Sequence, residues 1–472
     1  MAPTLANQLK IHIIGAGMGG MGSALALARA GYTDIHVWES ARSLGEVGAG
    51  INLTPNLSRI LDRWEVLDIA RAEAVALKSA SVLNCASDET LTNVDFGYIE
   101  REFGYPFTVR RKSSSSSTFL TSRSFQVVHR SALQKCLVTG AMGSGVVQLH
   151  LSKLVTDYDF EGSRFFVKER SSAPTIGANG QTDVLTEQAG EWVDADVILA
   201  ADGVKSKARA AMLGRIGEVD TVVDTGQAAY RIMVRKEQIN NDPDLLPFFT
   251  SSHSFRWIGE KRHIIAYPIA SGELFNMSTA HPDRRFVEAD TWTTTGSKSE
   301  MLNTFHDFCP RVQKLLNLVP EGDVLEWKLR VHEPLSTWVD HNVALVGDAC
   351  HPTLPHLAQG AAQAIEDAAV LGVVLSKIKS KDEIHKALLV YQAIRKPRAD
   401  WAVVTAAANG KGLHLGAGKD QKARDAAFRA AKKEGGENPD KALDKITQEI
   451  LYAHDCEVEA ANAFEKLFAH VA

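Results

Sequence analysis

The sequence predicts an α/β fold in which one α/β domain is interrupted by a mainly antiparallel β domain and followed by a helical tail. Near the N-terminus, "KIHIIGAG", "GSALALARAG" and "DIHVWE" indicate a strand, a helix and a strand, a βαβ unit typical of a parallel sheet. Between about residues 217 and 328 the chain alternates apolar and polar residues, as antiparallel strands do. After "HNVALVGDA" the pattern is helical to the C-terminus.

The composition is typical of a soluble protein with more than one domain. Its 472 residues exceed one ordinary hydrophobic core, and 45% hydrophobic with 23% charged residues is usual for globular proteins. The net charge of −5 gives no reason to expect nucleic acid or a membrane as partner, and no apolar run reaches the roughly 18 residues of a membrane span. The five cysteines form no CxxC pair, so we expect no metal site, no disulfide framework and a cytoplasmic location.

The helix and strand patterns predict that the α/β domain is discontinuous in sequence. We expect it to comprise residues 1–82, 126–215 and 335–405. The β domain is expected at residues 83–125 and 216–334, and the helical region at residues 406–472. Two insertions stand out: the serine-rich "TVRRKSSSSSTFLTSRSF", interpreted as either a lid or a surface excursion, and "APTIGANGQTD", interpreted as an inert hairpin loop.

Several elements carry local signals for where they begin and turn. In "TPNLSRILDRWEVLDIARA", Thr54 offers a helix N-cap and Pro55 suits the first helical position. "VHRSALQKCLVTGA" indicates a further helix, and "WVDADVILAADG" a buried strand that ends at an acid-glycine turn. "FRWIGEKRHIIAYPI" predicts a hairpin that turns near Gly259 and Glu260.

The first strand ends in a glycine-rich turn with the spacing G-x-G-x-x-G, at Gly15, Gly17 and Gly20. The first glycine allows a tight turn, the second lets the backbone approach a pyrophosphate, and the third permits close packing of helix on strand. Glu39, at the end of the next strand, suits an acceptor for ribose hydroxyls and would repel a 2′-phosphate. The pattern favours FAD or NAD over NADP, and its alternative is a βαβ turn without a ligand.

A second turn of interest follows a strand at Asp202-Gly203, with Ser206 and Arg209 downstream in "ADGVKSKAR". An acid-glycine turn in front of a helix supplies a side-chain oxygen that accepts from the first helical N–H groups. Taken alone, this pattern therefore favours a helix cap over a ligand site.

A third turn occurs in "VALVGDACHPTLPHLAQGAAQAIEDA", where Asp348 stands at a strand terminus. Open α/β sheets bind their ligands at such termini. Gly360 and Ala361 open the next helix and leave backbone N–H groups free for an anionic or electron-rich ligand edge. Taken alone, Asp348 is equally consistent with a simple cap.

In this order and spacing, the three motifs resemble the class A flavoprotein aromatic monooxygenases of the p-hydroxybenzoate hydroxylase superfamily, and most closely a salicylate hydroxylase-like fungal branch. The resemblance covers nearly the whole chain, including "GAGINLTPNLSRIL", "VVHRSALQ", "AYR" and the late "LYAHDCEVEAA". It implies a Rossmann-type, glutathione reductase-like FAD-binding domain, interrupted by the β domain, which would bind the substrate.

The resemblance also implies a set of FAD contacts. The glycine turn would lie at the pyrophosphate and Glu39 at the adenosine ribose. Asp348 would accept a hydrogen bond from the ribityl chain, and Gly360 and Ala361 would offer N–H groups to the pyrimidine edge of the flavin. Arg130 is expected at the pyrophosphate or ribityl side, its alternative being an exposed helix arginine. The full expected set is Gly15, Gly17, Gly20, Glu39, Gly50, Arg130, Asp202, Asp348, Gly360 and Ala361.

The activity that the resemblance implies is hydroxylation of a small aromatic substrate with O₂. NADPH or NADH, bound transiently, would reduce the flavin, which would trap O₂ as a C4a-hydroperoxide. The protein would position the flavin, exclude water and remove a phenolic proton from the substrate. The expected substrate is phenolic, salicylate-like or a secondary metabolite, and the expected assembly is a monomer or a homodimer.

Five residues are candidates for the substrate side. Pro355 matches a loop proline near the reacting flavin carbon, and His356 beside it is either a general base or a packed histidine. Strand alternation allows only one of Tyr230 and Arg231 to face the flavin, and we expect Tyr230. Arg209 is a second basic candidate, its alternative being an arginine that pins a helix.

Three other functions are alternatives to this reaction. A flavin epoxidase or ring-modifying oxygenase would use the same fold on a less activated substrate. A non-catalytic flavoprotein-fold binding protein would have lost the FAD residues, which are intact here. A non-haem iron oxygenase, suggested by "HPD" at His281 and Asp283, belongs with a jelly-roll fold that the N-terminal βαβ unit contradicts.

Overall fold

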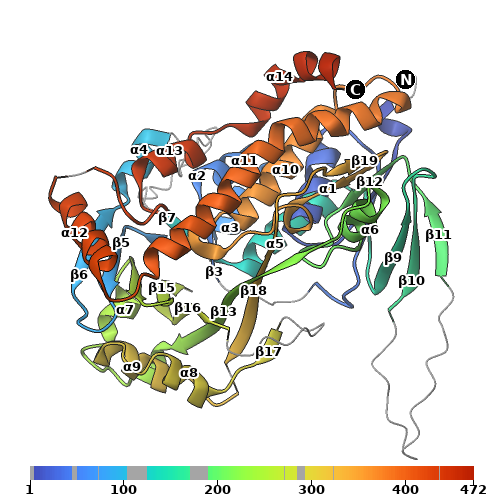
Figure 1. The fold of residues 1–472 in the computed structure, drawn as a ribbon. Helices are drawn as coiled ribbons and strands as arrows, with labels where there is room; N and C mark the ends of the chain where they lie inside the picture. The colour runs from blue at the N-terminus through green and yellow to red at the C-terminus, as the bar shows by residue number, and fades with distance from the viewer. Residues whose placement is uncertain are drawn as a thin grey trace, which may run out of the picture.

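In the computed structural model of the chain, the residues described are 5–44, 50–72, 74–103, 125–170, 190–269, 272–283, 293–322, 324–434 and 436–471. The serine-rich run and the "APTIGANGQTD" insertion lie outside them, so their expected roles stay predictions. The chain forms two main sheets with a long helical layer alongside (Figure 1).

The first sheet has six strands in the order β19-β20-β12-β1-β2-β8. All neighbours pair in parallel except β19 with β20. The central strands are apolar and buried along nearly their whole length, as expected when both faces of a parallel sheet are covered. The strands are β1 (Lys10–Ile14), β2 (Asp34–Trp38), β8 (Val147–His150), β12 (Val197–Ala200), β19 (Val339–Asp340) and β20 (Val343–Leu345).

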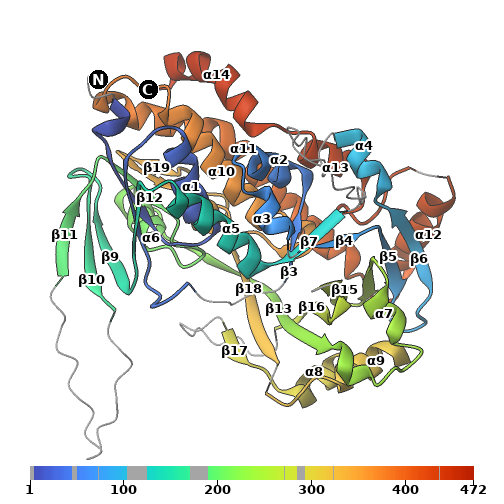
Figure 2. The ribbon, with the colours of Figure 1, turned by 180° about the vertical axis from the view of Figure 1, so that it is seen from behind.

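Helices cover one face of this sheet and a small sheet covers the other (Figures 1 and 2). On the helical face, α1 (Met18–Arg29) lies between α5 (Arg130–Gly143) and α10 (Gly360–Leu375) and contacts both. On the other face, Phe165 lies against His12 of β1, with 5.4 Å between ring centroids. The small antiparallel sheet consists of β9 (Lys153–Asp159), β10 (Arg164–Glu169) and β11 (Gly190–Asp194), and α6 (Lys207–Arg215) packs beside β9.

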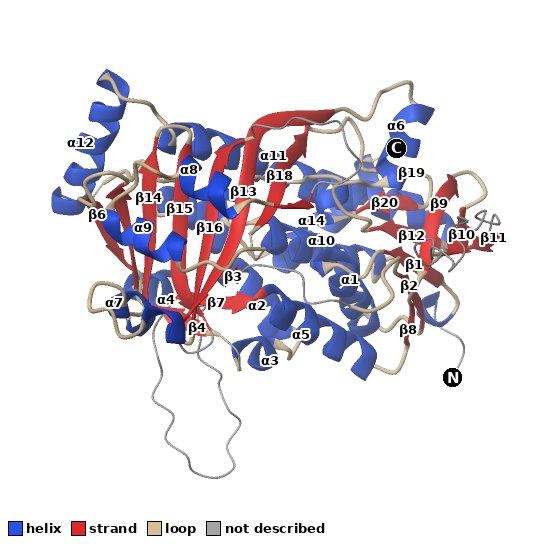
Figure 3. Cartoon of the chain, turned by 90° about the horizontal axis from the view of Figure 1, so that it is seen from below, coloured by secondary structure: helices blue, strands red, loops and turns tan. Residues whose placement is uncertain are grey.

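The second main sheet has eight strands in the order β17-β18-β13-β16-β15-β14-β5-β6, and Figure 3 shows it side by side with the first. It is antiparallel except where β14 pairs with β5. The predicted hairpin is confirmed, since β14 and β15 turn through Glu260 and Lys261. The strands are β5 (Ser79–Asn84), β6 (Thr90–Asp95), β13 (Val222–Arg235), β14 (His253–Gly259), β15 (Arg262–Ile269), β16 (Leu274–Pro282), β17 (Thr293–Thr295) and β18 (Leu325–His332).

The two faces of the eight-stranded sheet have different neighbours. One face forms an aromatic and aliphatic core with three short helices, α7 (Leu246–Thr250), α8 (Lys298–Thr304) and α9 (Pro310–Asn317). The other face lines a cavity that is described below. Because side chains alternate along a strand, this division decides which residues reach the cavity.

A small third sheet and three helices join the two main sheets. The sheet has the order β3-β7-β4, with β3 (Gly50–Leu53), β4 (Val75–Leu77) and β7 (Phe125–His129). The helix predicted from Thr54 begins at Pro55, but the Thr54 hydroxyl makes no cap. It is also two helices rather than one, because Glu65 takes a positive φ of 60° between them. The helices are α2 (Pro55–Arg63), α3 (Leu67–Arg71) and α4 (Gly97–Phe103).

The C-terminal helices form a layer that touches both domains. Figure 1 shows α14 lying along α10 and α11, and side chains of α14 complete the core of the first sheet. Side chains of α13 pack into a separate core with α4 and β15. The helices are α11 (Ile384–Leu413), α12 (Lys419–Glu434), α13 (Lys445–Tyr452) and α14 (Cys456–His470), and the 3₁₀ turns are η1 (Leu5–Asn7), η2 (Lys236–Ile239), η4 (Gly347–Ala349), η5 (Pro355–Leu357) and η6 (Lys381–Glu383).

Three of the expected domain boundaries lie inside elements. The boundary after residue 82 cuts β5, the boundary after residue 125 separates the first residue of β7 from the rest, and the boundary after residue 405 cuts α11. Within the described ranges, no helix is long and apolar enough to cross a bilayer.

Candidate active site

One cavity of about 390 Å³ lies where the two main sheets meet. Its walls include the glycine turn at Gly17, the segment from Gly347 to Ala361, and the open face of the eight-stranded sheet. A volume of this size is usual for a small-molecule site. The lining includes the expected residues Gly17, Gly50, Asp348, Pro355, Gly360 and Ala361.

The three motif glycines are required for different reasons. Gly15 has a φ of +100°, and a Cβ there would lie 2.4 Å from the carbonyl oxygen of Ala201. A Cβ at Gly20 would lie 1.9 Å from the carbonyl oxygen of Gly15, so this glycine allows α1 to pack on its strand. At Gly17 a Cβ would meet nothing within 4 Å, because the backbone borders the cavity. The turn therefore has the open cradle that a pyrophosphate needs at a helix N-terminus.

Glu39 stands beside the glycine turn. Its Oε2 accepts a hydrogen bond from the Ala16 N–H at 2.8 Å, and its Oε1 accepts one from the Ala41 N–H at 2.7 Å. The carboxylate is half-buried and belongs to the residue after β2. An acid is therefore in the place that the spacing indicated, and its contact with ribose stays a prediction.

The segment from Gly347 to Ala361, which contains Asp348, lines the cavity opposite the glycine turn, where the cofactor is expected. Asp348 is exposed while its neighbours Gly347 and Ala349 are buried, and it lines the cavity. Gly360 and Ala361 begin α10 and line the same cavity, so their unpaired N–H groups are at its edge. The chemistry of these donors and of the open glycine cradle fits an extended, phosphate-containing cofactor.

Gly50 lines the cavity for a reason that the sequence did not suggest. A Cβ at this position would lie 2.4 Å from the hydroxyl oxygen of Tyr267. The glycine therefore allows β3 to approach a side chain of the β domain. Arg130 begins α5, and its side chain lies outside the described residues.

Asp202 caps a helix. Its Oδ2 accepts hydrogen bonds from the N–H groups of Lys207 and Ala208, at 2.8 and 3.3 Å, at the start of α6. Its Oδ1 is buried and has no partner among the described residues, and burial raises the pKa of the carboxyl group. Gly203, not Asp202, lines the cavity. A role for Asp202 toward FAD stays a prediction.

Arg209 joins two loops and lies outside the cavity lining. Its guanidinium pairs with Asp220 at 2.9 Å and donates to the carbonyl oxygens of Val204 and Ala349 at 2.8 and 2.9 Å. The side chain is 1% exposed. These contacts correct the expectation that Arg209 touches the substrate, because its donors hold the turns before α6 and after β20 together.

The expectation that Tyr230, rather than Arg231, faces the flavin side of the sheet is also corrected. Tyr230 lies in the core between the sheet and the helices, where its ring stacks on His281 with 4.0 Å between centroids. Arg231 lines the cavity, and its guanidinium lies 4.6 Å from the centroid of the Trp327 ring. Alternation does place only one of the pair on the cavity face, and that residue is Arg231.

His356 is a packed side chain and not a base at the cavity. Pro355 and Leu357 line the cavity, whereas the His356 ring is buried against α11, where a Cβ at Gly410 would lie 2.4 Å from its Cδ2. Neither ring nitrogen has a hydrogen-bond partner among the described residues. Burial, followed by the nearby charges, lowers the pKa of His356 to about 3. A histidine with such a pKa is a poor proton acceptor from a phenol.

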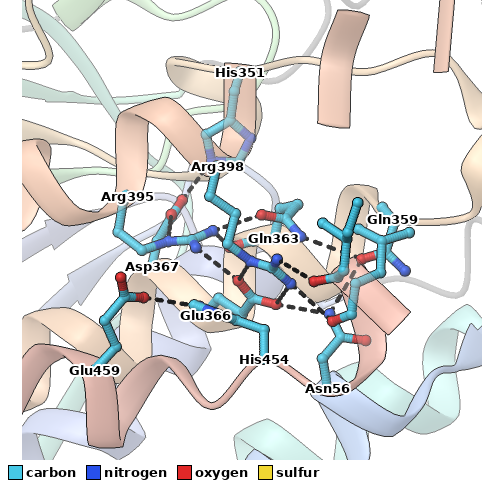
Figure 4. Close-up of polar contacts among 12 residues, drawn as sticks. Asn56, His351, Gln359, Gln363, Glu366, Asp367, Arg395, Arg398, His454 and Glu459 are labelled. Carbon is cyan, nitrogen blue, oxygen red and sulfur yellow. Dashed lines mark hydrogen bonds and ion pairs between the residues drawn. The ribbon is translucent and has the colours of Figure 1, made fainter. Parts of the chain in front are cut away.

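A buried network of ion pairs holds the loop that precedes α10 in place (Figure 4). Asp367 accepts from the Gly347 N–H at 2.9 Å, pairs with His351 at 2.6 Å and pairs with Arg395 at 2.9 Å. Glu366 pairs with both Arg395 and Arg398. Although burial opposes it, the Asp367 carboxylate raises the pKa of His351 well above its usual value. The network fixes Gly347, the neighbour of the cavity-lining residue Asp348.

Several cavity residues were missed by sequence reasoning. Arg256 and Tyr267 line the cavity from β14 and β15, and Gln448 and Tyr452 line it from α13. The sequence does contain a signal for Arg256 and Tyr267, because it predicts the hairpin and the hairpin register places both side chains on one face. The sequence contains no such signal for Gln448 and Tyr452, because only the packing of the C-terminal helices brings them to the cavity.

Comparisons with known proteins agree with this geometry. The family described as FAD binding domain matches residues 8–407. An FAD-dependent monooxygenase of Aspergillus candidus, cfoG, is 32% identical over 402 residues, 83% of each chain. A 3-hydroxybenzoate 6-hydroxylase of Klebsiella oxytoca is 28% identical over 422 residues, 89% of this chain and 92% of its own.

Solved structures have the same fold. A salicylate hydroxylase in complex with its substrate superposes with a TM-score of 0.72, covering 98% of both chains at 21% identity. This likeness extends to the β domain and the C-terminal helices, since coverage is nearly complete. With the glycine cradle, the Asp348 segment and the family match over most of the chain, the protein belongs to the FAD-binding-domain family as a class A FAD-dependent monooxygenase.

Proposed function

We propose that the protein hydroxylates a phenolic aromatic substrate, using FAD, NADPH or NADH, and O₂. The observation that carries this proposal is that one cavity is lined both by expected FAD-binding residues and by a sheet face that presents Arg231 and Tyr267. Relatives named 3-hydroxybenzoate 6-hydroxylase and hispidin-3-hydroxylase support a phenolic substrate class.

The residues of the cofactor end have the chemistry to hold FAD. The Gly17 turn offers backbone N–H groups at the start of α1 for the pyrophosphate, and Asp348 offers a carboxylate for a ribityl hydroxyl. Gly360 and Ala361 offer the N–H groups of α10, whose dipole favours negative charge. When bound, FAD supplies hydride acceptance from the nicotinamide and activation of O₂.

The substrate end has the groups that activate a phenol. Burial raises the pKa of Tyr267, with Arg231 acting in the opposite direction, so Tyr267 stays protonated at neutral pH and has a proton to donate to a ligand. The positive charge of Arg231 favours the phenolate form of a substrate hydroxyl, and a phenolate ring is the better nucleophile. Trp327 packs against the Arg231 guanidinium and limits its orientations.

The rest of this end excludes water. Leu77, Phe96, Ile265 and Leu443 line the cavity and surround the two polar groups with apolar surface. Charge interactions strengthen where water is excluded, so the effect of Arg231 on the substrate hydroxyl is greater there than in solution.

The proposal is tested by NADPH and NADH oxidation with FAD-loaded protein against a panel of phenols, hydroxybenzoates and alkenes, with the product mass measured. We expect phenols to stimulate oxidation and to gain one oxygen atom. Arg231→Met should lower kcat/KM by about 10²-fold or more and shift its pH profile toward higher pH, because the substrate hydroxyl loses its charge partner.

The matched control is Met233→Leu, two residues along the same strand and partly exposed. It should leave turnover unchanged. Oxidation stimulated by alkenes alone would indicate an epoxidase, and stoichiometric peroxide with no oxygenated product from any phenol would overturn the proposal.

A further inference from the structure

The side chain of Asn409 joins two walls of the cavity that are far apart in the chain. Asn409 belongs to α11 and is 2% exposed. Its Nδ2 donates to the carbonyl oxygen of His356 and to Oδ1 of Asp440, both at 3.0 Å, and its Oδ1 accepts from the Lys441 N–H at 2.9 Å. Both N–H donors of the amide and one lone pair of its oxygen are therefore used within the protein.

The first of these walls is the loop that precedes α10. Pro355 and Leu357 of this loop line the cavity. The carbonyl group that Asn409 binds belongs to His356, the residue between them. The ring of His356 packs against Gly410, the residue that follows Asn409 in α11. One helix therefore fixes both the backbone and the ring at this point of the loop.

The second wall is the C-terminal strap, residues 438–444, which belongs to the connection between α12 and α13. Ala442 and Leu443 of the strap line the cavity. Several N–H groups of the strap bond to atoms of the strap itself, namely those of Asn438, Asp440, Ala442 and Leu443. The Lys441 N–H bonds instead to Asn409. The strap therefore holds its own shape, and side chains outside it decide where it lies.

Two sets of polar contacts attach the strap to the other walls. Arg256 of β14 pairs with Asp440, whose side chain is 0% exposed, and this ion pair attaches the strap to the sheet. The hydrogen bonds of Asn409 attach the strap to α11 and, through the His356 carbonyl, to the loop. Apolar residues of the loop also pack against Ala442, but apolar contact has no preferred direction. The amide of Asn409 therefore gives the strap and the loop a defined position relative to each other.

We propose that Asn409 is a positioning residue for the hydroxylation: its amide sets the distance between the loop and the strap, and so closes the cavity to water. The inference rests on the hydroxylase function proposed above and adds the residue that keeps its site closed. Exclusion of water prevents side reactions of a reduced, oxygen-activating site. In an open site, NAD(P)H, a proton and O₂ give NAD(P)⁺ and hydrogen peroxide, in place of NAD(P)⁺, water and the hydroxylated product.

The first test compares FAD-loaded Asn409→Ala with the wild-type protein and needs no substrate. The variant removes the partner of the His356 carbonyl and of the Lys441 N–H but leaves the pair of Asp440 with Arg256. We expect amide hydrogen exchange in residues 353–358 and 438–444 to become about tenfold faster, the size of a lost buried hydrogen bond. Quenching of flavin fluorescence by acrylamide, a small neutral probe, should rise about twofold or more as the cavity opens.

The second test measures product and peroxide with a phenol that the wild-type protein hydroxylates. In Asn409→Ala the rate of NAD(P)H oxidation at saturating phenol should change by less than about twofold, because the residues expected to bind FAD are untouched. The product formed per NAD(P)H should fall about threefold or more, with the difference released as peroxide. A purely structural role would lower the amount of active enzyme and leave this ratio unchanged.

Two further variants serve as controls. Asn409→Ser retains one donor and one acceptor and should give intermediate values, and it replaces Asn409→Ala if that variant loads no FAD. Thr304→Val, in α8 on the helix-covered face of the eight-stranded sheet, removes a buried hydrogen bond to the Glu300 carbonyl oxygen. It should leave exchange in the two segments, quenching and the product ratio unchanged.

Unchanged exchange in either segment, unchanged quenching or an unchanged product ratio in Asn409→Ala would overturn the inference, as would the same changes in Thr304→Val. Failure of the inference and failure of the function are separable. If the wild-type protein hydroxylates phenols and Asn409→Ala behaves as the wild type does, the inference alone fails. If no phenol gives an oxygenated product, the hydroxylase function fails, and exchange and quenching still decide whether Asn409 closes the cavity.

Discussion

His351 and His356 belong to one loop, and both are almost completely buried, yet their electrostatic environments are opposite. His351 lies 2.6 Å from Asp367, which raises its pKa well above the usual value. His356 has no hydrogen-bond partner among the described residues, and burial lowers its pKa to about 3. Burial is the same in the two cases, so the partner on the neighbouring helix decides the charge.

The two histidines hold the loop in different ways. His351 and Gly347 are held on α10 by the charge of Asp367, whereas His356 is held on α11 by the fit of its ring to Gly410. Thr353 and Pro355, between these two points, line the cavity. The loop therefore has an ionic attachment at one end and a steric attachment at the other, and each can be removed separately.

The largest effect is expected from breaking the ionic attachment. Asp367→Asn removes the charge shared by His351 and Arg395 and places an amide group where the Gly347 N–H and two cations need an acceptor. We expect a loss of about 3–5 kcal/mol in the free energy of unfolding, because buried charges lose their partner. Urea unfolding measures it, and FAD binding should weaken in parallel as Gly347 shifts.

The control for this variant is Asp420→Asn on exposed α12, which should change stability by less than about 0.5 kcal/mol. If Asp367→Asn were as stable as this control, the network would not hold the loop.

A smaller effect is expected from removing the steric fit. Gly410→Ala places a methyl group 2.4 Å from Cδ2 and 2.5 Å from Nε2 of His356, whose side chain is buried. We expect a destabilisation of about 1–3 kcal/mol from overpacking. The KM for the substrate should also rise, because Pro355 moves with the ring. Thermal unfolding and steady-state kinetics measure the two effects.

Gly412→Ala, on the same helix, is the matched control, since a Cβ there meets nothing within 4 Å. It should stabilise the protein slightly, by about 0.5–1 kcal/mol, through helix propensity. Combining Gly410→Ala with His356→Ala should restore part of the lost stability, and strict additivity of the two changes would contradict direct contact.

The smallest effect at neutral pH is expected from His356→Leu, whose signature is the pH dependence of stability. The folded-state pKa of about 3 is below the value near 6.5 of an unfolded histidine, so the unfolded chain binds more protons between these values. The stability that His356 supports is therefore complete above about pH 6.5 and falls by on the order of 1 kcal/mol per pH unit below it. His351, with a raised pKa, has the opposite sign and loses stability at alkaline pH.

Urea unfolding between pH 5 and 7.5 measures this slope. We expect His356→Leu to reduce it, whereas His306→Leu, at an exposed histidine, should not. An unchanged slope in His356→Leu would show that His356 is not held neutral by its surroundings.

The parts of the site that depend on local backbone geometry were predictable. Gly15 and Gly20 are needed because a Cβ at either would collide with a backbone oxygen within the same βαβ unit or its neighbouring strand. Asp348 follows a strand, Gly360 and Ala361 open a helix, and all three line the cavity; their contacts with FAD stay predictions. These features could be predicted from the sequence because the strand, turn and helix signals lie within a few residues of one another.

The orientation of side chains in the β domain was not predictable in the same way. Period-two alternation established that Tyr230 and Arg231 face opposite sides, but not which side borders the cavity. That was decided by the helices α7 to α9, which cover the Tyr230 face. Similarly, nothing near His356 in sequence indicates Gly410, the residue that draws its ring away from the cavity.

The sequence by itself determined the FAD-binding fold, the glycine turn and the class of chemistry, because these depend on short-range periodicity and on glycines that no other residue replaces. The tertiary structure alone decided that Arg231, Arg256 and Tyr267 share one cavity face and that Ala442, Leu443, Gln448 and Tyr452 also line the cavity. The physical reason is that these positions come from strands and helices far apart in the chain, and only sheet register and packing bring them together.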